Sequence, residues 1–113
     1  MIVYKICPAE AWEEAARAGR FEGAGIDLAD GYIHFSTAAQ VAETAARHFA
    51  GRDGLVLVAV EAEALGAALK WEPARGGALF PHLYAALPAR AALWVKPMPL
   101  GPDGTHRLPA LEG

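Results

Sequence analysis

The sequence predicts an α+β protein with two early helices and with strands over most of the remaining chain. Residues 2–7 are rich in β-branched and aromatic side chains, and Pro8 then opens a helix that has acidic residues early and stops at Gly19. Residues 55–60 form an unbroken apolar run of strand length, which is typical of a strand covered on both faces. Because strands dominate the later chain, this order favours an α+β fold over a doubly wound parallel sheet.

The segment between the first helix and the next strand, residues 20–31, is predicted to be an ordered loop. It holds three glycines and two aspartates among a few isolated apolar residues. We expect Phe21, Ile26 and Leu28 to anchor this loop in the core. A connector of about 12 residues without secondary structure is uncommon in small domains and is often functional.

A second helix is predicted after a short strand at residues 32–35. The stretch from Thr37 to Gln40 matches a capping box, which typically begins a helix, and the helical pattern then extends to about residue 50. Its buried stripe is expected to consist of Val41, Ala45 and Phe49.

Strands account for most of the later chain. Residues 55–60 are expected at the centre of the sheet, because an unbroken apolar run needs cover on both faces. Further strands are predicted near residues 69–72 and 92–96, and residues 80–84 are expected to be extended between them.

The length and composition predict one domain. A chain of 113 residues that is 54% hydrophobic and 20% charged can bury one core but not two independent ones. We expect a single α+β domain over residues 1–97, followed by a proline-rich tail over residues 98–113 that packs on this domain or extends from it.

Charge and cysteine content exclude several classes of function. A formal net charge of -3 without a basic stripe argues against a general nucleic-acid binder. The single cysteine, Cys7, excludes an intrachain disulfide and a cysteine metal cluster, and it is interpreted as a small buried residue. Since no apolar run reaches the length of a membrane span, we expect a soluble, cytoplasmic protein that does not bind membranes.

Side-chain alternation along the predicted strands places several polar residues on common faces. Tyr32, His34 and Ser36 share one face of the strand near residue 34, opposite two apolar residues. Glu72 lies opposite Trp71, and in an extended segment His82 and Tyr84 fall on the same face. If these faces converge, they line one cleft, and the residues expected there are His34, Ser36, Glu72, His82 and Tyr84.

Each of these residues also has a structural interpretation. His34 could be a strand histidine bonded to a backbone carbonyl, and Ser36 and Thr37 could cap the second helix. Glu72 could be a solvated carboxylate at a strand end, and His82 could be a turn residue. The two histidines and the glutamate could ligate zinc, but zinc motifs usually hold a close pair of ligands on one element, so no metal site is predicted.

Several sequence strings carry a resemblance to a known family. The longest are Asp-Gly-Tyr-Ile-His-Phe-Ser-Thr at residues 30–37 and Phe-Pro-His-Leu-Tyr at residues 80–84. The shorter ones are Tyr4-Lys5-Ile6, Trp12, Gln40, Glu43-Thr44-Ala45 and Trp71-Glu72. With these strings the chain, to about residue 97, resembles the bacterial domain-of-unknown-function family 952. The resemblance implies an ADP-ribosyltransferase-like fold, in which a split, mainly antiparallel sheet holds NAD in a cleft.

The resemblance also implies roles for individual residues. Lys5 on the first strand would bind the ligand, and Ser36 and Thr37 partly match a Ser-Thr-Ser string of one branch of that superfamily. Glu72 would accept a ribose hydroxyl and stabilise an oxocarbenium-like centre as nicotinamide leaves. In the chemistry that the resemblance implies, His34 and Ser36 would orient ribose or phosphate, Tyr84 would stack on a ring, and His82 would serve as acid or base.

Three functions therefore stay open from the sequence. The protein could be a divergent ADP-ribosyltransferase-type enzyme that uses NAD or a related nucleotide. It could instead be a module on the same fold that binds a small molecule without catalysis. The third alternative is an interaction domain in which apolar residues beyond those needed for the core form the contact face of a homodimer.

Overall fold

The structure is a computed structural model that describes residues 1–113, apart from the side chain of Arg75. Its main sheet has the strand order β4-β1-β5-β9, and every neighbouring pair in it is antiparallel. The four strands are β1 (Ile2–Pro8), β4 (Ser36–Thr37), β5 (Leu55–Glu61) and β9 (Ala92–Pro97). β5 pairs with β1 on one side and β9 on the other, which confirms its predicted central position.

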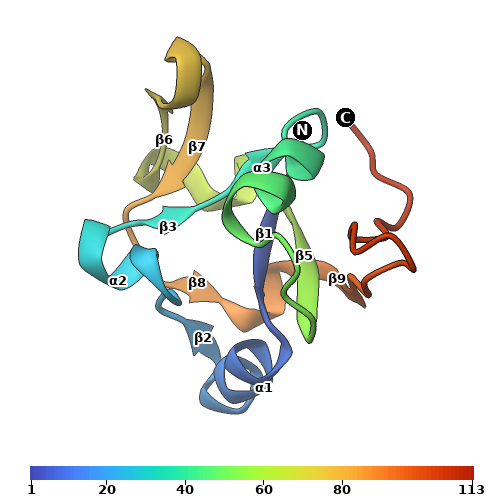
Figure 1. Ribbon diagram of the computed structural model, residues 1–113. Coiled ribbons are helices and arrows are strands. Elements are labelled where there is room, and N and C mark those ends of the chain that lie inside the picture. Colours follow the sequence, from blue (N-terminus) through green and yellow to red (C-terminus); the bar gives the residue numbers. More distant parts are fainter.

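Two smaller sheets stand beside the main one. A three-stranded sheet contains β3 (Ile33–His34), β7 (Leu79–Leu83) and β6 (Leu69–Pro73), in that order. Strands β2 (Arg20–Phe21) and β8 (Leu87–Pro88) form the third sheet. The observed architecture is an α+β protein with mainly antiparallel strands divided among three sheets. In Figure 1 the β6–β7 hairpin projects from the body at the end opposite α1.

Three α-helices accompany the sheets: α1 (Ala9–Ala18), α2 (Ile26–Asp30) and α3 (Val41–His48). Helix α1 begins one residue later than predicted, because Pro8 is the last residue of β1, and it ends as predicted before Gly19, which is in the left-handed conformation with φ 88°. The chain also forms three 3₁₀ segments, which are η1 (Ala62–Ala68), η2 (Arg75–Gly77) and η3 (Ala89–Ala91).

The core lies on both faces of the main sheet. One cluster packs residues such as Val3, Trp12 and Val58, and the other packs residues such as Tyr4 and Leu57. Neighbouring residues of β1 and β5 belong to different clusters, so the unbroken apolar run of β5 is explained by cover on both faces.

The prediction for residues 20–31 was wrong in two respects. The segment is not a plain loop, since it contains β2 and the five-residue helix α2. Phe21 is buried as expected, but Ile26 and Leu28 are exposed over 58% and 68% of their surface. The residue of α2 that is buried is Asp27, because its carboxylate is bound by groups from three other segments of the chain.

The second helix starts later than the sequence predicts. Thr37 belongs to β4, and α3 begins only at Val41 after a turn. One half of the predicted capping box does form, since the backbone N–H of Thr37 donates to Oε1 of Gln40 at 3.0 Å. Val41 and Ala45 are buried as predicted, and Phe49 is half-buried at the C-cap.

The last residues of the chain contact the second core cluster. Met98 is fully buried, and Leu108 and Leu111 pack against this cluster. The hydroxyl of Tyr4 donates to the carbonyl of Glu112 and accepts from its N–H, both at 2.8 Å. Figure 1 shows this segment passing outside β9.

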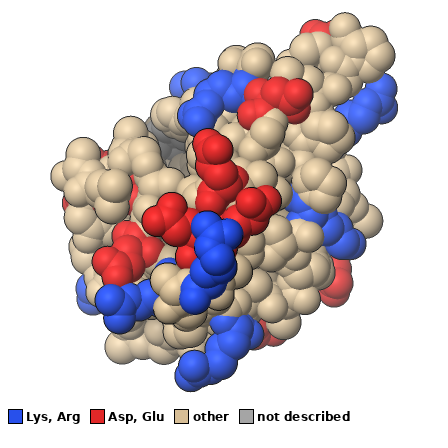
Figure 2. Space-filling model, turned by 90° about the horizontal axis from the view of Figure 1, so that it is seen from below, with Lys and Arg blue, Asp and Glu red and all other residues tan. Residues whose placement is uncertain are grey.

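Charged side chains of both signs share the surface. On the face shown in Figure 2, acidic residues gather near the middle and basic residues lie between and around them, so this face has no continuous basic stripe. In the part of the chain that the structure describes, none of the helices has the length and apolar character needed to cross a membrane.

Candidate functional site

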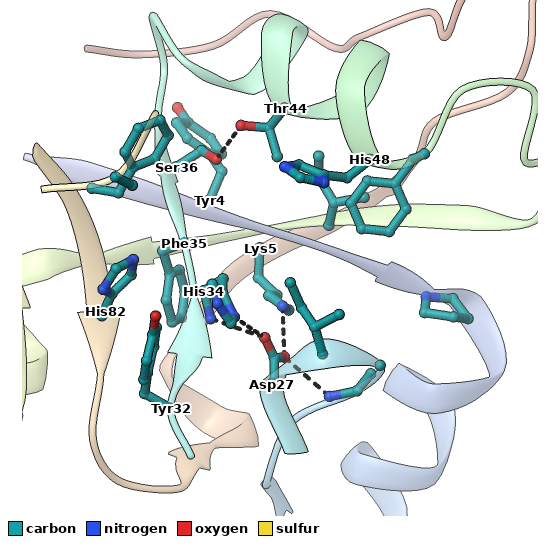
Figure 3. Close-up of a pocket in the computed structure, with 18 of the residues that line it drawn as sticks. Tyr4, Lys5, Asp27, Tyr32, His34, Phe35, Ser36, Thr44, His48 and His82 are labelled. Carbon is teal, nitrogen blue, oxygen red and sulfur yellow. Dashed lines mark hydrogen bonds and ion pairs between the residues drawn. The ribbon is translucent and has the colours of Figure 1, made fainter. Parts of the chain in front are cut away.

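A pocket of about 530 Å³ lies between α2 and α3, with β1, β3, β4 and β7 contributing to its walls. Figure 3 shows Ser36, Thr44 and His48 on the α3 side and Asp27, Lys5 and His34 on the α2 side. A volume of this size is typical of small-molecule sites. Its lining includes the aromatic side chains of Tyr4, Tyr32, Phe35, Phe49 and Phe80.

Asp27 is the most densely bonded residue of the pocket. Its Oδ2 accepts from Nζ of Lys5 at 2.7 Å and from the backbone N–H of Ala24 at 3.0 Å. Its Oδ1 accepts from Nδ1 of His34 at 2.6 Å and from the backbone N–H of His34 at 3.1 Å. These four bonds fill the lone pairs of the carboxylate and hold α2 against β1 and β3.

The short helix α2 can place Asp27 here because glycines bound it on both sides. Gly25, at the N-cap, has φ 57°, and Gly31, at the C-cap, has φ 84°. A residue with a side chain rarely adopts such angles.

The contacts of Asp27 determine its charge. Burial by itself would raise the pKa of Asp27, since it penalises the charged form. The hydrogen bond from His34, the charge and hydrogen bond of Lys5 and the backbone N–H of Ala24 outweigh burial and lower the pKa to about 2. Asp27 is therefore a carboxylate near neutral pH.

His34 is bound by carboxylates at both ring nitrogens. Besides the bond from Nδ1 to Asp27, its Nε2 lies 2.9 Å from Oδ2 of Asp30. A neutral imidazole donates from only one nitrogen, so only the protonated ring can donate to both carboxylates. In this arrangement His34 binds Asp27 and Asp30, near the two ends of α2, and has no free nitrogen for a ligand.

Lys5 is buried, but only part of the hydrogen-bonding capacity of its ammonium group is used. Its side chain is 6% exposed and lines the pocket, and its ammonium carries three N–H donors. Within the described part of the chain, the only acceptor that it contacts is Oδ2 of Asp27. Burying an ammonium is costly unless its donors are used, so the remaining donors are available to a ligand in the pocket.

A second hydrogen-bonded group lies on β6 and β7. Nδ1 of His82 lies 2.8 Å from Oε1 of Glu72, and the hydroxyl of Tyr84 donates to the same oxygen at 2.8 Å. The hydrogen bonds from His82 and Tyr84 lower the pKa of Glu72, and the bond to Glu72 raises the pKa of Tyr84 to about 12. Glu72 is thus an ionised acceptor and Tyr84 is a neutral donor.

Tyr32 connects the two groups through its ring. Its ring centroid lies 4.5 Å from that of His34, 4.3 Å from that of His82 and 5.0 Å from that of Tyr84. The β3–β7 pairing brings His34 and His82 opposite each other, at 5.4 Å between ring centroids. The two hydrogen-bonded groups are therefore in contact with each other, and Tyr32, His34 and His82 at their junction line the pocket.

The wall of the pocket on the α3 side is also polar. The hydroxyls of Ser36 and Thr44 are 3.0 Å apart, and His48 lies one helical turn after Thr44. Arg52, just beyond α3, lines the pocket and places its guanidinium 5.2 Å from the ring centroid of Phe49. Among the side chains that the structure describes, the fully charged ones in the lining are those of Lys5, Arg52 and Asp27.

Most of the residues singled out from the sequence meet in this region. Lys5, His34, Ser36 and His82 line the pocket. Glu72 and Tyr84 contact His82, Tyr84 also packs on Tyr32, and neither residue belongs to the lining. Thr37 is likewise outside the lining, where its backbone N–H binds Gln40.

Sequence reasoning missed Asp27, the residue that organises the α2 side of the site. The available signal was an aspartate enclosed by glycines in a segment too long for a plain connector. Among the residues that the structure describes, no group of three or more His, Cys, Asp or Glu side chains is arranged to hold a metal ion.

Comparisons with known proteins show a close structural relative. The family model described as "Protein of unknown function (DUF952)" matches residues 6–95. The crystal structure of protein CC0527 from Caulobacter crescentus has a TM-score of 0.91 and 48% sequence identity to this chain, and the match covers 95% of this chain and 94% of that one. The solution NMR structure of CC0527 has a TM-score of 0.83 and 50% identity over 92% and 90% of the two chains. No match was found among the curated proteins.

Proposed function

We propose that the pocket of this chain, which belongs to the DUF952 family of unknown function, binds a small anionic ligand of the nucleotide type, such as NAD or ADP-ribose. The proposal concerns binding; whether the bound ligand is also turned over is a separate question with its own assay.

The observation that carries this proposal is the state of Lys5. A buried ammonium with one acceptor and unused donors, in the wall of a pocket, needs further oxygen acceptors. Asp27 cannot supply them, because its four bonds already occupy both of its oxygens. Phosphate oxygens are well suited, since each bears negative charge and accepts several hydrogen bonds.

Charge and shape support the same class of ligand. Among the described side chains of the lining, Lys5 and Arg52 outnumber Asp27, so this part of the lining carries a net positive charge even with its histidines neutral. Aromatic side chains from β1, β7 and α3 offer apolar surface for a base or a nicotinamide ring. The resemblance to ADP-ribosyltransferase-like proteins points to the same ligand class, and in it the first strand, which here carries Lys5, binds the ligand.

The position of Glu72 favours binding over ADP-ribosyl transfer. Transfer of that kind would need a carboxylate at the ribose, and the resemblance assigns this role to Glu72. Here the carboxylate is bound to His82 and Tyr84 and is not part of the pocket lining. A ribose in the pocket would therefore meet His82 before it met Glu72.

Calorimetric titration of the protein with ADP-ribose, NAD and AMP tests the proposal, with adenosine as the ligand without phosphate. We expect the phosphorylated ligands to bind and adenosine to bind more weakly. Lys5→Met should lower the affinity for the phosphorylated ligands at least tenfold. Lys96→Met, at an exposed position of β9, should leave this affinity unchanged.

The variant needs a folding control, because Lys5→Met leaves Asp27 without its counter-ion. The double variant Lys5→Met/Asp27→Asn removes both charges of the pair and avoids an unpaired buried carboxylate. The proposal is wrong if none of the ligands binds, or if a folded variant without Lys5 binds ADP-ribose like the unmodified protein.

A second assay separates binding from turnover. The protein is incubated with NAD, and free nicotinamide is measured against a sample without protein. Since Glu72 does not reach the pocket lining, we expect NAD to bind without release of nicotinamide. Release that is abolished in Glu72→Ala and retained in Lys96→Ala would instead establish a transferase or hydrolase.

A further inference from the structure

The geometry of β6 and β7 points to a role for Glu72 that differs from direct contact with a ligand. We propose that Glu72 is a positioning residue that fixes the tautomer of His82, so that Nε2 of His82 faces the pocket as an unprotonated acceptor for a hydroxyl group of the ligand. The contact with a ligand hydroxyl rests on the proposed function, whereas the tautomer of His82 is a property of the free protein.

The first step concerns the proton on Nδ1. Nδ1 of His82 and the hydroxyl of Tyr84 both lie 2.8 Å from the same oxygen of Glu72. An ionised carboxylate accepts hydrogen bonds and cannot donate them. Nδ1 must therefore carry a proton, which leaves the lone pair of the neutral ring on Nε2.

The second step concerns the direction of Nε2. His82 is 4% exposed and lines the pocket, whereas Glu72 does not. Because Nδ1 is bound to Glu72, which lies outside the lining, Nε2 is the ring nitrogen that remains for a contact with the cavity. Figure 3 shows the ring of His82 at the pocket wall beside Tyr32 and Phe35. Over the described residues, Nε2 has no hydrogen-bond partner in the protein, so a buried acceptor is left open toward the pocket.

The surroundings hold the ring in this orientation. Tyr32 packs on one side of His82 at 4.3 Å between centroids, and His34 meets it edge-on at 5.4 Å. His34 cannot take over the same role, since both of its nitrogens are bound to carboxylates. The pocket thus presents donors at Lys5 and one acceptor at His82, a combination that suits a ligand with both phosphate oxygens and ribose hydroxyls.

Nuclear magnetic resonance can read this tautomer directly in the free protein. Long-range ¹H–¹⁵N correlations distinguish a protonated ring nitrogen from an unprotonated one, and the signals of His82 are identified by their loss in His82→Gln. In the neutral form of the ring we expect a protonated Nδ1 and an unprotonated Nε2. A neutral ring that carries its proton on Nε2 would overturn the inference.

Substitutions at Glu72 test what sets the tautomer. Glu72→Gln keeps an oxygen that can accept from Nδ1 and should preserve the tautomer, whereas Glu72→Leu removes the acceptor and should shift the proton toward Nε2. Glu14→Leu, on the exposed face of α1, is the matched control and should change nothing. An unchanged tautomer in Glu72→Leu would show that Glu72 has no such role.

Titration with ADP-ribose completes the test. Binding should shift the Nε2 signal of His82. Glu72→Leu should lower the affinity for ADP-ribose roughly fivefold to tenfold, which corresponds to the contribution of about one hydrogen bond. If ADP-ribose binds while Nε2 does not respond and Glu72→Leu retains full affinity, this inference fails and the proposed function stands. If ADP-ribose does not bind at all, the proposed function fails, and the tautomer in the free protein still decides the role of Glu72.

Discussion

Replacement of Asp27 by asparagine is the sharpest test of how the pocket is held together. Asp27→Asn keeps the size of the side chain but removes its charge and one of its two acceptor oxygens. Lys5 is then left buried without a counter-ion, and the two donors that bind one of the carboxylate oxygens must face an amide N–H₂. Both effects destabilise the folded state more than the unfolded one.

The size of the effect follows from the geometry and from the pKa of Asp27. Holding this pKa at about 2, against an ordinary value of 3.8, corresponds to about 2.5 kcal/mol in favour of the charged form. Removing one partner of a buried ion pair typically costs about 3 to 5 kcal/mol. We therefore expect Asp27→Asn to lower the free energy of unfolding by about 3 kcal/mol at neutral pH. A domain of this length has roughly 6 to 17 kcal/mol of stability, so the variant should still fold.

Urea denaturation followed by tryptophan fluorescence measures this loss. The midpoint should fall with little change in the slope of the transition, which would show that stability changed and that the surface exposed on unfolding did not. In a double-mutant cycle, Lys5→Met/Asp27→Asn should lose less stability than the sum of the two single variants, because the second change removes the charge that the first leaves unpaired. A loss below about 1 kcal/mol for Asp27→Asn, or strict additivity, would refute the assignment of a buried, coupled pair.

Three further predictions follow from the same structure. Because the pKa of Asp27 is lower in the folded protein than its ordinary value of 3.8, the stabilising effect of Asp27 is complete above about pH 4 and is lost as the pH falls toward 2. Acid unfolding followed by circular dichroism should therefore show that Asp27→Asn loses less stability over this pH range than the unmodified protein. Burial raises the pKa of the Cys7 thiol to about 11, so a disulfide reagent at neutral pH should label Cys7 only after unfolding, and rapid labelling of the native protein would contradict its burial. Gly23→Ala would place a Cβ 2.8 Å from the Cβ of Asp27 at φ 118°, whereas the Cβ of Gly25→Ala would meet no atom within 4 Å at φ 57°. Backbone strain should destabilise both variants, by about 1 kcal/mol for Gly25→Ala. Thermal unfolding should show the larger loss of stability for Gly23→Ala, because it adds a steric clash to the strain.

Elements with strong local signals agree closely with their prediction from sequence. Helix α1 has a proline before it and a left-handed glycine after it, and both act within a few residues of the helix. The unbroken apolar run of β5 required cover on both faces, and the structure provides it with two core clusters. Helix α2 has no comparable signal, since five residues are too few to be stable through propensity alone.

The candidate site was predictable in part for a similar reason. Alternation along one strand predicts Tyr32, His34 and Ser36 on a common face, and all three line the pocket. The predicted strand at residues 32–35 is wrong, because His34 belongs to β3 and Ser36 to β4, which lie in different sheets, and Phe35 between them lines the pocket as well. The same alternation put Glu72 on the face that meets His82 across the β6–β7 pair. It could not show that His82, rather than Glu72, faces the cavity, because that depends on how the small sheet packs on the rest of the molecule.

Local periodicity and turn chemistry were thus enough to derive the α+β class and the order of the main elements. These properties depend on neighbours within a few positions of one another. The arrangement of Lys5, Asp27 and His34 needed the folded chain, because it joins β1, α2 and β3 through bonds to a single carboxylate. An aspartate looks the same in a sequence whether it is solvated or buried, and only the packing of these three elements determined that Asp27 would be enclosed and that a pocket would remain beside it.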